Sequence, residues 1–310
     1  HNEFFEEIAK LRAARRIWAR MMRDRYGAKN ERSWFMKTHV QTAGCSLTEQ
    51  QPLNNIVRVA YQAMAAVLGG CQSLHTDSMD ETLGLPTEQA VTVALRTQQI
   101  LAHETGVTRT VDPLGGSWFM ETLTDKIEEE ALQLIEDIDN MAGGPWAPER
   151  IDSLSTKPAF AESPSRERGD SPSPSSLSFY RGGVIEGIHK GYFRRQIAEA
   201  SYRYSEECEA HDRIIVGVNE YTDDNEERPI DILVIPDSVE TEQVDRLAKF
   251  KANRDAKAAN AALDAIRETC RANDNVMPAL IEASLANCTL GEMVQAMADI
   301  YGRYNGGPEW

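Results

Sequence analysis

The segments KTHVQTAG at 37–44 and QSLHTDSMDE at 72–81 decide the fold. Each reads as a short strand that ends in a loop and is followed by a helix. Successive side chains of a strand point to opposite faces, so alternate residues share a side. The residues that share one side are Phe35, Lys37, His39 and Gln41 in the first segment and Cys71, Ser73, His75 and Asp77 in the second. Two neighbouring strands that direct histidines and other polar groups to one side indicate an active-site mouth on a β/α scaffold.

The composition defines the broad class of protein. The chain has 310 residues, of which 41% are hydrophobic and 26% charged, and this is typical of a globular protein with one large domain or two. Its formal net charge of −16 disfavours a nucleic-acid-binding or anionic-membrane surface. We therefore expect neither nucleic acid nor a membrane as a partner.

Cysteine usage and hydropathy bear on the compartment. The five cysteines are odd in number, scattered and without a CxxC pair, which argues against both a disulfide framework and a zinc site. No apolar run approaches the roughly 18 residues that span a bilayer, and no signal peptide precedes the first amphipathic segment. We expect a cytoplasmic protein without a metal site formed by its own side chains.

Strands and helices alternate along the first part of the chain. Helical periodicity predicts a long amphipathic helix from the start of the chain to about residue 22, and further helices over about 52–67, 86–104 and 122–141. One polar strand falls between the first and second helices, and the other between the second and third. Alternation of strands with helices of this length predicts parallel βα units.

The number of strands is too small for a closed barrel. A complete (β/α)8 barrel needs eight strands and about 250 residues, whereas residues 1–141 supply only about two convincing strands. The chain also begins with His1 and leaves no room for a strand before its first helix. We therefore expect an α/β fold in which residues 1–144 are the C-terminal portion of a (β/α)8 TIM barrel. They would belong to a longer polypeptide or to a half that needs a partner.

The rest of the chain differs in kind. Residues 145–181 are rich in proline, serine and charge, which predicts a disordered insertion. Residues 182–310 predict a mostly helical C-terminal region that opens with a helix over about 184–210. Within it, apolar runs at 214–219 and 232–235 predict two short strands.

A set of ordered motifs resembles one family, the large catalytic subunit of methylmalonyl-CoA mutase. The motifs are RAARR at 12–16, THVQTAG at 38–44, QQPLNN at 50–55, QSLHT at 72–76, DE at 80–81 with LPT at 85–87, VDP at 111–113 with GGS at 115–117, and IVGVN at 215–219. The likeness covers about 1–144 and 182–303. It implies a barrel whose cavity takes a coenzyme A thioester, with adenosylcobalamin (coenzyme B12) across its C-terminal mouth and a radical rearrangement of the substrate's carbon skeleton.

The resemblance also implies roles for individual residues. It makes His39 and Gln41 catalytic candidates that face the reaction cavity, while Ser73 and His75 would line the thioester channel. The positions that match cofactor-binding residues are Gly44 against the corrin, Glu81 at the adenosyl ribose, and Asp77, Thr82 and Leu85. The chain departs from the family pattern at two of them, since Asp77 stands where the family usually has Asn and Thr82 where it usually has Ala. The change from Asn to Asp removes a hydrogen-bond donor and adds charge.

Other parts that the family uses are missing from these 310 residues. The side chains that hold the acyl carboxylate and the thioester carbonyl belong to the N-terminal half of the barrel. No Asp-x-His-x-x-Gly motif occurs, so the histidine that binds cobalt from below, with its Rossmann-like domain, must lie elsewhere. The partners implied are the missing N-terminal half and a separate cobalamin-binding small subunit, and the chain alone is expected to be inactive.

The substrate and even the class of protein stay open at this point. The resemblance favours interconversion of methylmalonyl-CoA and succinyl-CoA, with isobutyryl-CoA mutase or ethylmalonyl-CoA mutase as alternatives. A different class is an inactive fragment or interaction module that pairs with a cobalamin-binding subunit and catalyses nothing.

Overall fold

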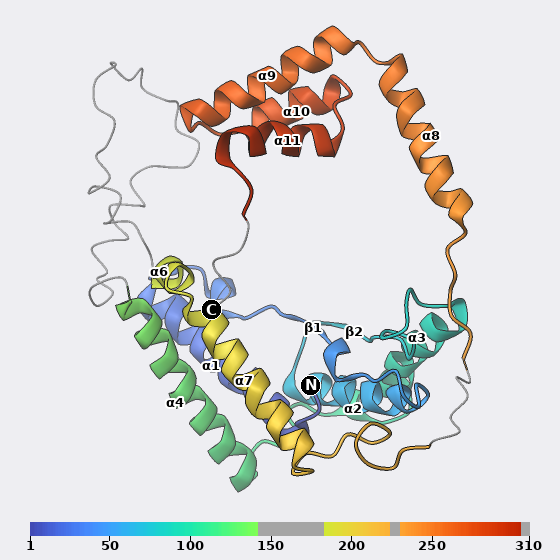
Figure 1. Cartoon of the computed structure of the whole chain (residues 1–310). Coiled ribbons are helices and arrows are strands. Elements are labelled where there is room, and N and C mark those ends of the chain that lie inside the picture. Colours follow the sequence, from blue (N-terminus) through green and yellow to red (C-terminus); the bar gives the residue numbers. More distant parts are fainter. Residues whose placement is uncertain (142–182, 224–229, 305–310) are drawn as a thin grey trace. The chain divides into compact units, whose positions relative to one another are not determined.

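The computed structural model describes residues 1–141, 183–223 and 230–304 and divides the chain into two compact units, His1–Leu233 and Val234–Trp310 (Figure 1). The insertion expected at 145–181 lies outside the described residues. The boundary between the units falls inside the region 182–310 that the sequence predicts to be mostly helical.

The first unit contains every helix and strand predicted before residue 144. Its elements are α1 (Phe4–Arg20), η1 (Met21–Arg25), η2 (Glu31–Trp34), β1 (His39–Gln41), η3 (Gly44–Ser46), α2 (Asn54–Gly69), β2 (Ser73–His75), α3 (Glu88–His103), η4 (Val107–Arg109), α4 (Trp118–Asn140), α6 (Gly183–His189) and α7 (Tyr192–Glu209). Side-chain caps begin two of the helices, because Thr87 accepts a hydrogen bond from the third residue of α3 and Ser117 does the same for α4.

The two strands form a parallel pair joined by α2. In register, His39 lies beside Ser73, Val40 beside Leu74 and Gln41 beside His75. This is the βα arrangement that the alternation predicts, since parallel neighbours need a crossover connection. Among the described residues the sheet has these two strands and no others, so a barrel portion is not seen.

Helix α1 packs against both α2 and α4 (Figure 1). The buried cluster at these contacts consists of Ile8 and Ala9 of α1, Ala65 of α2 and Met120 of α4. The alanines let the helix backbones approach closely, and Phe4, Leu68, Leu114, Leu123 and Ile127 pack around the cluster. This apolar seam fixes α2, and therefore the strands on either side of α2 in the chain.

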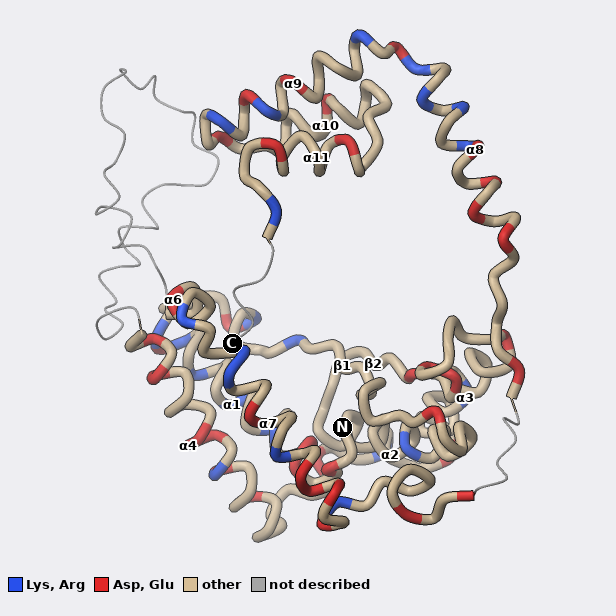
Figure 2. The backbone as a smooth tube through the Cα atoms, in the orientation of Figure 1, with Lys and Arg blue, Asp and Glu red and all other residues tan. Residues whose placement is uncertain are grey.

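The arginines of the RAARR motif have structural partners. Arg12 pairs with Asp112 and Glu121, and Arg16 pairs with Asp125 and Glu128, so charges of α1 face acidic residues in and before α4 (Figure 2). These partners fit the ordinary role of charged residues on a packed helix.

Arg15 acts differently from its two neighbours. Its guanidinium donates to the backbone oxygens of Gly69 and Gly70, where α2 ends. Burial lowers the pKa of Arg15. The side chain thus caps free carbonyls at a helix C-terminus, where a cation also suits the helix dipole.

Three expectations for the segment after 182 are wrong. The single helix predicted over 184–210 is split into α6 and α7, because Gly191 adopts φ +65°, a left-handed conformation that ends one helix before the next begins.

The strand predicted at 214–219 is a turn. Gly217 has φ +82°, and its N–H donates to the Glu220 oxygen at 2.8 Å. The Asn219 side chain donates to the oxygens of Cys208 and Arg213 and accepts from the N–H of Ile215. Local hydrogen bonds therefore satisfy backbone groups that would otherwise pair with a neighbouring strand. The segment takes part in one isolated β-bridge, between Val216 and Glu220.

The strand predicted at 232–235 is also wrong. These residues are not part of any strand, and all four side chains are exposed. An extended β-branched segment becomes a strand only where a neighbouring strand accepts and donates its ladder bonds.

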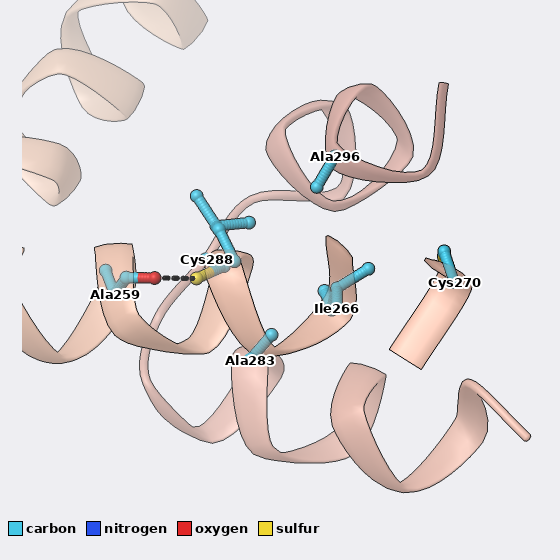
Figure 3. Close-up of a cluster of buried hydrophobic side chains, with 7 residues drawn as sticks. Ala259, Ile266, Cys270, Ala283, Cys288 and Ala296 are labelled. Atoms are coloured by element: carbon cyan, nitrogen blue, oxygen red, sulfur yellow. Dashed lines mark hydrogen bonds between the residues drawn. The ribbon is translucent and has the colours of Figure 1, made fainter. Parts of the chain in front are cut away.

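The second unit is helical, as predicted. It consists of α8 (Asp237–Asn253), α9 (Ala256–Ala272), α10 (Met277–Leu285) and α11 (Leu290–Tyr301). Helix α9 contacts both α10 and α11 around a buried cluster of Ala259, Leu263, Ile266, Cys270, Ala283, Cys288 and Ala296 (Figure 3). Asp255 caps the start of α9, and Thr289 and Glu292 form a capping box at the start of α11.

None of the described helices combines the length and the apolar character that crossing a membrane requires.

Candidate active site

Four predicted site residues lie together on one face of the β1–β2 sheet. His39 and Ser73 are register partners, as are Gln41 and His75, and all four side chains are exposed. The Nδ1 atom of His39 lies 2.6 Å from the Oγ atom of Ser73, a hydrogen bond in which the histidine tautomer decides the donor. The sheet therefore presents a row of hydrogen-bonding groups, which is the arrangement that the two sequence segments predict.

Asp77 links the ends of the two strands. Its carboxylate is buried and accepts from Gln41 Nε2 at 2.8 Å through Oδ1 and from Thr42 Oγ1 at 2.8 Å through Oδ2. Its own N–H donates back to Thr42 Oγ1 at 2.9 Å. The Nε2 atom of His75 lies 3.7 Å from Asp77 Oδ1. Both carboxylate oxygens thus serve residues at the end of β1.

The loops after the two strands meet at Gly44 and Glu81. A Cβ atom placed on Gly44 would lie 3.3 Å from Glu81 Cγ, tighter than ordinary side-chain contact. The Glu81 side chain is exposed, and its carboxylate makes no hydrogen bond or ion pair with another described residue. A free acceptor therefore stands beside a backbone segment that has no side chain.

The loop that carries Glu81 is held from below by Asp80. This carboxylate is buried and accepts from Ser78 Oγ at 2.5 Å and from the N–H of Thr87 at 2.9 Å. Thr82 and Leu85 lie on the same loop with their side chains exposed. Asp80 thus fixes both ends of a short loop whose outer residues are available for contact.

Asn55 is a site residue that the sequence interpretation missed. It is fully buried at the start of α2, and its Nδ2 donates to the Thr48 oxygen at 2.8 Å and to the Met79 oxygen at 3.0 Å. Its Oδ1 accepts from the Thr48 N–H at 3.1 Å. One amide therefore ties together the loop after β1 and the loop after β2.

Gln62 holds the first loop from one further point on α2. Its Oε1 accepts from the N–H of Ala43 at 2.6 Å, and its Nε2 donates to Ser46 Oγ at 2.6 Å. Asn55 and Gln62 are seven residues apart, so they share the buried side of the helix with Val59. Asn55 and Gln62 could have been identified from the sequence, because they place two amide side chains on an otherwise apolar face of the helix.

A pocket of about 1070 Å³ lies next to this site. The loop at 45–50, the start of α2 and the turn at 214–218 line it, and of the predicted site residues it includes Thr82. Arg58 in its wall donates to Thr48 Oγ1, Asn55 Oδ1 and the Val216 oxygen, each at 2.8 Å, and burial lowers the pKa of Arg58. The exposed polar residues of the strand face, His39, Gln41, Ser73 and His75, do not line this pocket.

Among the residues that the structure describes, no group of three or more histidine, cysteine, aspartate or glutamate side chains is placed to hold a metal ion.

Polar groups at the carboxyl ends of parallel strands, with loops held by the intervening helix, are typical of the ligand sites of β/α proteins. The chain matches the methylmalonyl-CoA mutase family over residues 1–150 and 180–303, and it belongs to that family. The family is one of isomerases, more narrowly intramolecular transferases. The resemblance carried by the motifs is therefore confirmed.

Three relatives illustrate the match. The chain is 39% identical over 302 residues to the probable mitochondrial methylmalonyl-CoA mutase of Caenorhabditis elegans, covering 97% of this chain and 35% of that protein. It is 39% identical over 308 residues to methylmalonyl-CoA mutase of Rhizobium meliloti, covering 99% and 37%. It is 34% identical over 308 residues to the 2-hydroxyisobutanoyl-CoA mutase large subunit of Aquincola tertiaricarbonis, covering 99% and 48%. The chain thus spans 35 to 48% of the length of these relatives.

Proposed function

We propose that this chain supplies the C-terminal part of the catalytic barrel of an adenosylcobalamin-dependent acyl-CoA mutase that interconverts methylmalonyl-CoA and succinyl-CoA. The observation that carries the proposal is the meeting of Gly44 and Glu81 at the ends of two polar parallel strands, in a chain of this family. Sites at the carboxyl ends of parallel strands are where β/α enzymes bind their ligands.

The side chains around Gly44 fit adenosylcobalamin. The glycine allows a flat macrocycle to approach the backbone, and the free Glu81 carboxylate is an acceptor suited to ribose hydroxyls. Exposed Leu85 and Thr82 offer apolar and polar contacts on the same loop. When bound, the cofactor supplies radical chemistry that amino-acid side chains cannot, and the protein binds, orients and shields it.

The strand face suits the acyl-CoA substrate. Ser73 and His75 are proposed to hydrogen-bond the thioester arm, and His39 and Gln41 are proposed to face the reacting carbon skeleton. The 2.6 Å contact of His39 with Ser73 and the 2.8 Å contact of Gln41 with Asp77 support this, because both fix side-chain orientation before a ligand arrives. Hydrogen-bonding groups of this kind orient a substrate while a closed barrel keeps water away.

Two partners are part of the proposal. The chain spans at most 48% of the three relatives described above, which supports an N-terminal barrel half as one partner. The printed name of the Aquincola relative, a large subunit, supports a separate cobalamin-binding small subunit as the other. Exposed Val91 and Leu95 on α3 supply an apolar surface for the missing half.

One observation favours a second candidate substrate class. The Aquincola relative is named for a different acyl-CoA, so likeness in this region is compatible with more than one acyl group. Mutases of isobutyryl-CoA and ethylmalonyl-CoA are the alternatives.

The cysteines bear on the cellular compartment. All five are free thiols, which supports a reducing location, and we propose the cytoplasm.

Reconstitution tests the proposal. The chain is combined with the N-terminal region of a relative and a cobalamin-binding subunit, loaded with adenosylcobalamin, and given methylmalonyl-CoA, isobutyryl-CoA or ethylmalonyl-CoA. Mass spectrometry of the acyl-CoA pool is expected to show succinyl-CoA formed from methylmalonyl-CoA when all components are present. An assembled and cofactor-loaded complex that isomerises none of the three substrates would favour an interaction module instead.

A further inference from the structure

Two cysteines lie near one tyrosine at the pocket described above. Cys45 in η3 and Tyr204 of α7 both line that pocket. Cys208 follows Tyr204 by one helical turn, so the two side chains share a face of α7. The fold thus brings a cysteine of the loop after β1 close to a cysteine from a distant part of the chain.

The Tyr204 hydroxyl is close to both sulfur atoms. Burial raises the pKa of Tyr204, and so does the neighbouring Cys208, with which the Tyr204 side chain forms a hydrogen bond. Cys45 acts on the same hydroxyl in the same direction, whereas the nearby Arg213 guanidinium acts against both. Such electrostatic effects weaken with distance, so a tyrosine that responds to two thiols has both of them nearby.

The five cysteines differ in accessibility. Cys45 is exposed, whereas Cys208 is partly buried. Of the other three, Cys71 is partly buried, and Cys270 and Cys288 are buried. Burial also raises the pKa of Cys71 and of Cys288, which disfavours their reactive thiolate forms. An oxidant that arrives from solvent should therefore reach Cys45 first, with Cys208 as the thiol close to it.

Neither of the two segments belongs to a packed core. No residue of α7 is buried, and the single turn of η3 contains no buried residue either. A disulfide needs Cα atoms about 4.4–6.8 Å apart, so its formation draws the loop and the helix together. Exposed elements can follow such a shift at little cost, because the shift opens no cavity in a close-packed interior.

We propose that Cys45 and Cys208 form a reversible oxidation site, in which Cys45 reacts with a peroxide and Cys208 resolves the product. The Cys45 thiolate attacks hydrogen peroxide and the O–O bond breaks. One oxygen stays on sulfur as a sulfenic acid, and the other leaves as hydroxide, which the proton released by the thiol converts to water. The Cys208 sulfur then attacks the Cys45 sulfur, the S–S bond forms, the S–O bond breaks, and a second water leaves with the Cys208 proton.

The disulfide joins two walls of the pocket. Cys45 belongs to the wall formed by the loop at 45–50, and Cys208 stands on the helix that contributes Tyr204 to the opposite wall. Oxidation therefore fixes the loop that follows Gly44 to α7 and narrows the pocket. Thiol reductants reverse the bond, so it is a transient disulfide of the kind found in reducing compartments.

Mass spectrometry of peptides from the full chain, reduced and then treated with hydrogen peroxide, tests the site. The wild type is expected to yield a linked Cys45–Cys208 peptide that dithiothreitol removes. Cys208→Ser is expected to lose the linked peptide and to accumulate sulfenic acid on Cys45, which dimedone traps. Cys45→Ser should lose both signals. Cys71→Ser is the matched control and should behave as the wild type, because Cys71 is also partly buried but lies outside this pocket.

Hydrogen exchange gives a second readout. Peroxide should slow exchange over residues 44–50 in the wild type and leave it unchanged in Cys208→Ser. A linked peptide of Cys45 with any other cysteine, or equal dimedone labelling of Cys45 in the wild type and in Cys208→Ser, overturns the proposal. A Cys45–Cys208 peptide of mixed isotopes, from ¹⁴N and ¹⁵N chains combined before oxidation, places the bond between copies and overturns it too. Neither cofactor nor acyl-CoA is used, so the result does not depend on the proposed function.

Discussion

The α9–α11 bundle and the β1–β2 sheet differ in how completely they bury their side chains. In the bundle, seven buried residues from neighbouring stretches of chain close a core, and side-chain caps begin α9 and α11. In the sheet, two strands of three residues pair with each other, and the outward residues of both are exposed. The bundle completes its core from local sequence, whereas the sheet gains its full set of neighbours only from more strands.

The largest expected effect comes from breaking the bundle core. Ile266→Ala removes a fully buried side chain of α9 and should lower the free energy of unfolding of the second unit by about 2–5 kcal/mol. Hydrogen exchange measured by mass spectrometry should show faster exchange in α9–α11 and unchanged exchange in α1–α4. The matched control is Ile281→Ala, because Ile281 is 54% exposed. Equal losses for both substitutions would mean that the core is not where the structure has it.

The next effect concerns the amide that joins the two site loops. Asn55→Ala leaves the backbone groups of Thr48 and Met79 without their partner and should cost about 1–3 kcal/mol in the first unit. Exchange should speed up in both the 44–50 and 78–81 loops together. Asn54→Ala next to it removes a bond to Gln51 and should cost less than about 1 kcal/mol. Loosening of one loop without the other would contradict the shared role of Asn55.

A smaller effect depends on pH. The Arg254 guanidinium, and next the Thr289 backbone, hold the pKa of Glu292 well below its ordinary value of 4.5. A carboxyl group whose pKa is lower in the folded state than in the unfolded state stabilises the fold at pH values above the unfolded-state pKa. This stabilisation is lost as the pH falls toward the folded-state pKa. Glu292→Gln should therefore lower the free energy of unfolding by roughly 1–2 kcal/mol at neutral pH. This difference between the wild type and the variant should become smaller below about pH 4.5.

Urea titrations of the wild type and of Glu292→Gln over that pH range measure the difference in their free energies of unfolding. Glu282→Gln is the control, because Glu282 is exposed. If this difference stays constant as the pH is lowered, the charge of Glu292 is not the source of its contribution to stability.

The smallest effect on the chain itself falls on the exposed side of α3. Leu95→Lys changes a side chain that is 50% exposed, so the free energy of unfolding should move by no more than about 0.5 kcal/mol. If this surface receives the missing barrel half, the same substitution should weaken association with the N-terminal region, as measured by sedimentation. Wild-type association of Leu95→Lys would place that partner on another surface.

Much of the fold follows from periodicity alone. Alternation in a strand has a period of two, so His39 and Gln41, and Ser73 and His75, had to share a face once the strands were identified. The helices follow from the 3.6-residue period in the same way. The local pattern therefore predicts the elements and the composition of the polar face.

Specific side-chain hydrogen bonds and a glycine turn explain what the sequence could not predict. The run IIVGVN has the β-branched composition of a strand, but Gly217 turns and the Asn219 side chain takes over the backbone bonds. The loop contacts of Asn55 and the Asp77–Gln41 pair join residues that are 7 to 36 positions apart. No local pattern encodes such pairs, because they depend on how the strands and helices pack.

The central claim is that the loop after β2 holds the adenosyl group while the strand face holds the thioester. In the reconstituted enzyme, Glu81→Gln should weaken adenosylcobalamin binding or slow cobalt–carbon homolysis by about tenfold or more, through loss of a charge-assisted hydrogen bond of roughly 1.5–3 kcal/mol, and leave acyl-CoA binding nearly intact. His75→Ala should raise the substrate KM more than it disturbs the cofactor spectrum. Stopped-flow absorbance of Glu81→Gln is the direct measurement. Cofactor affinity and homolysis at wild-type values would contradict the account.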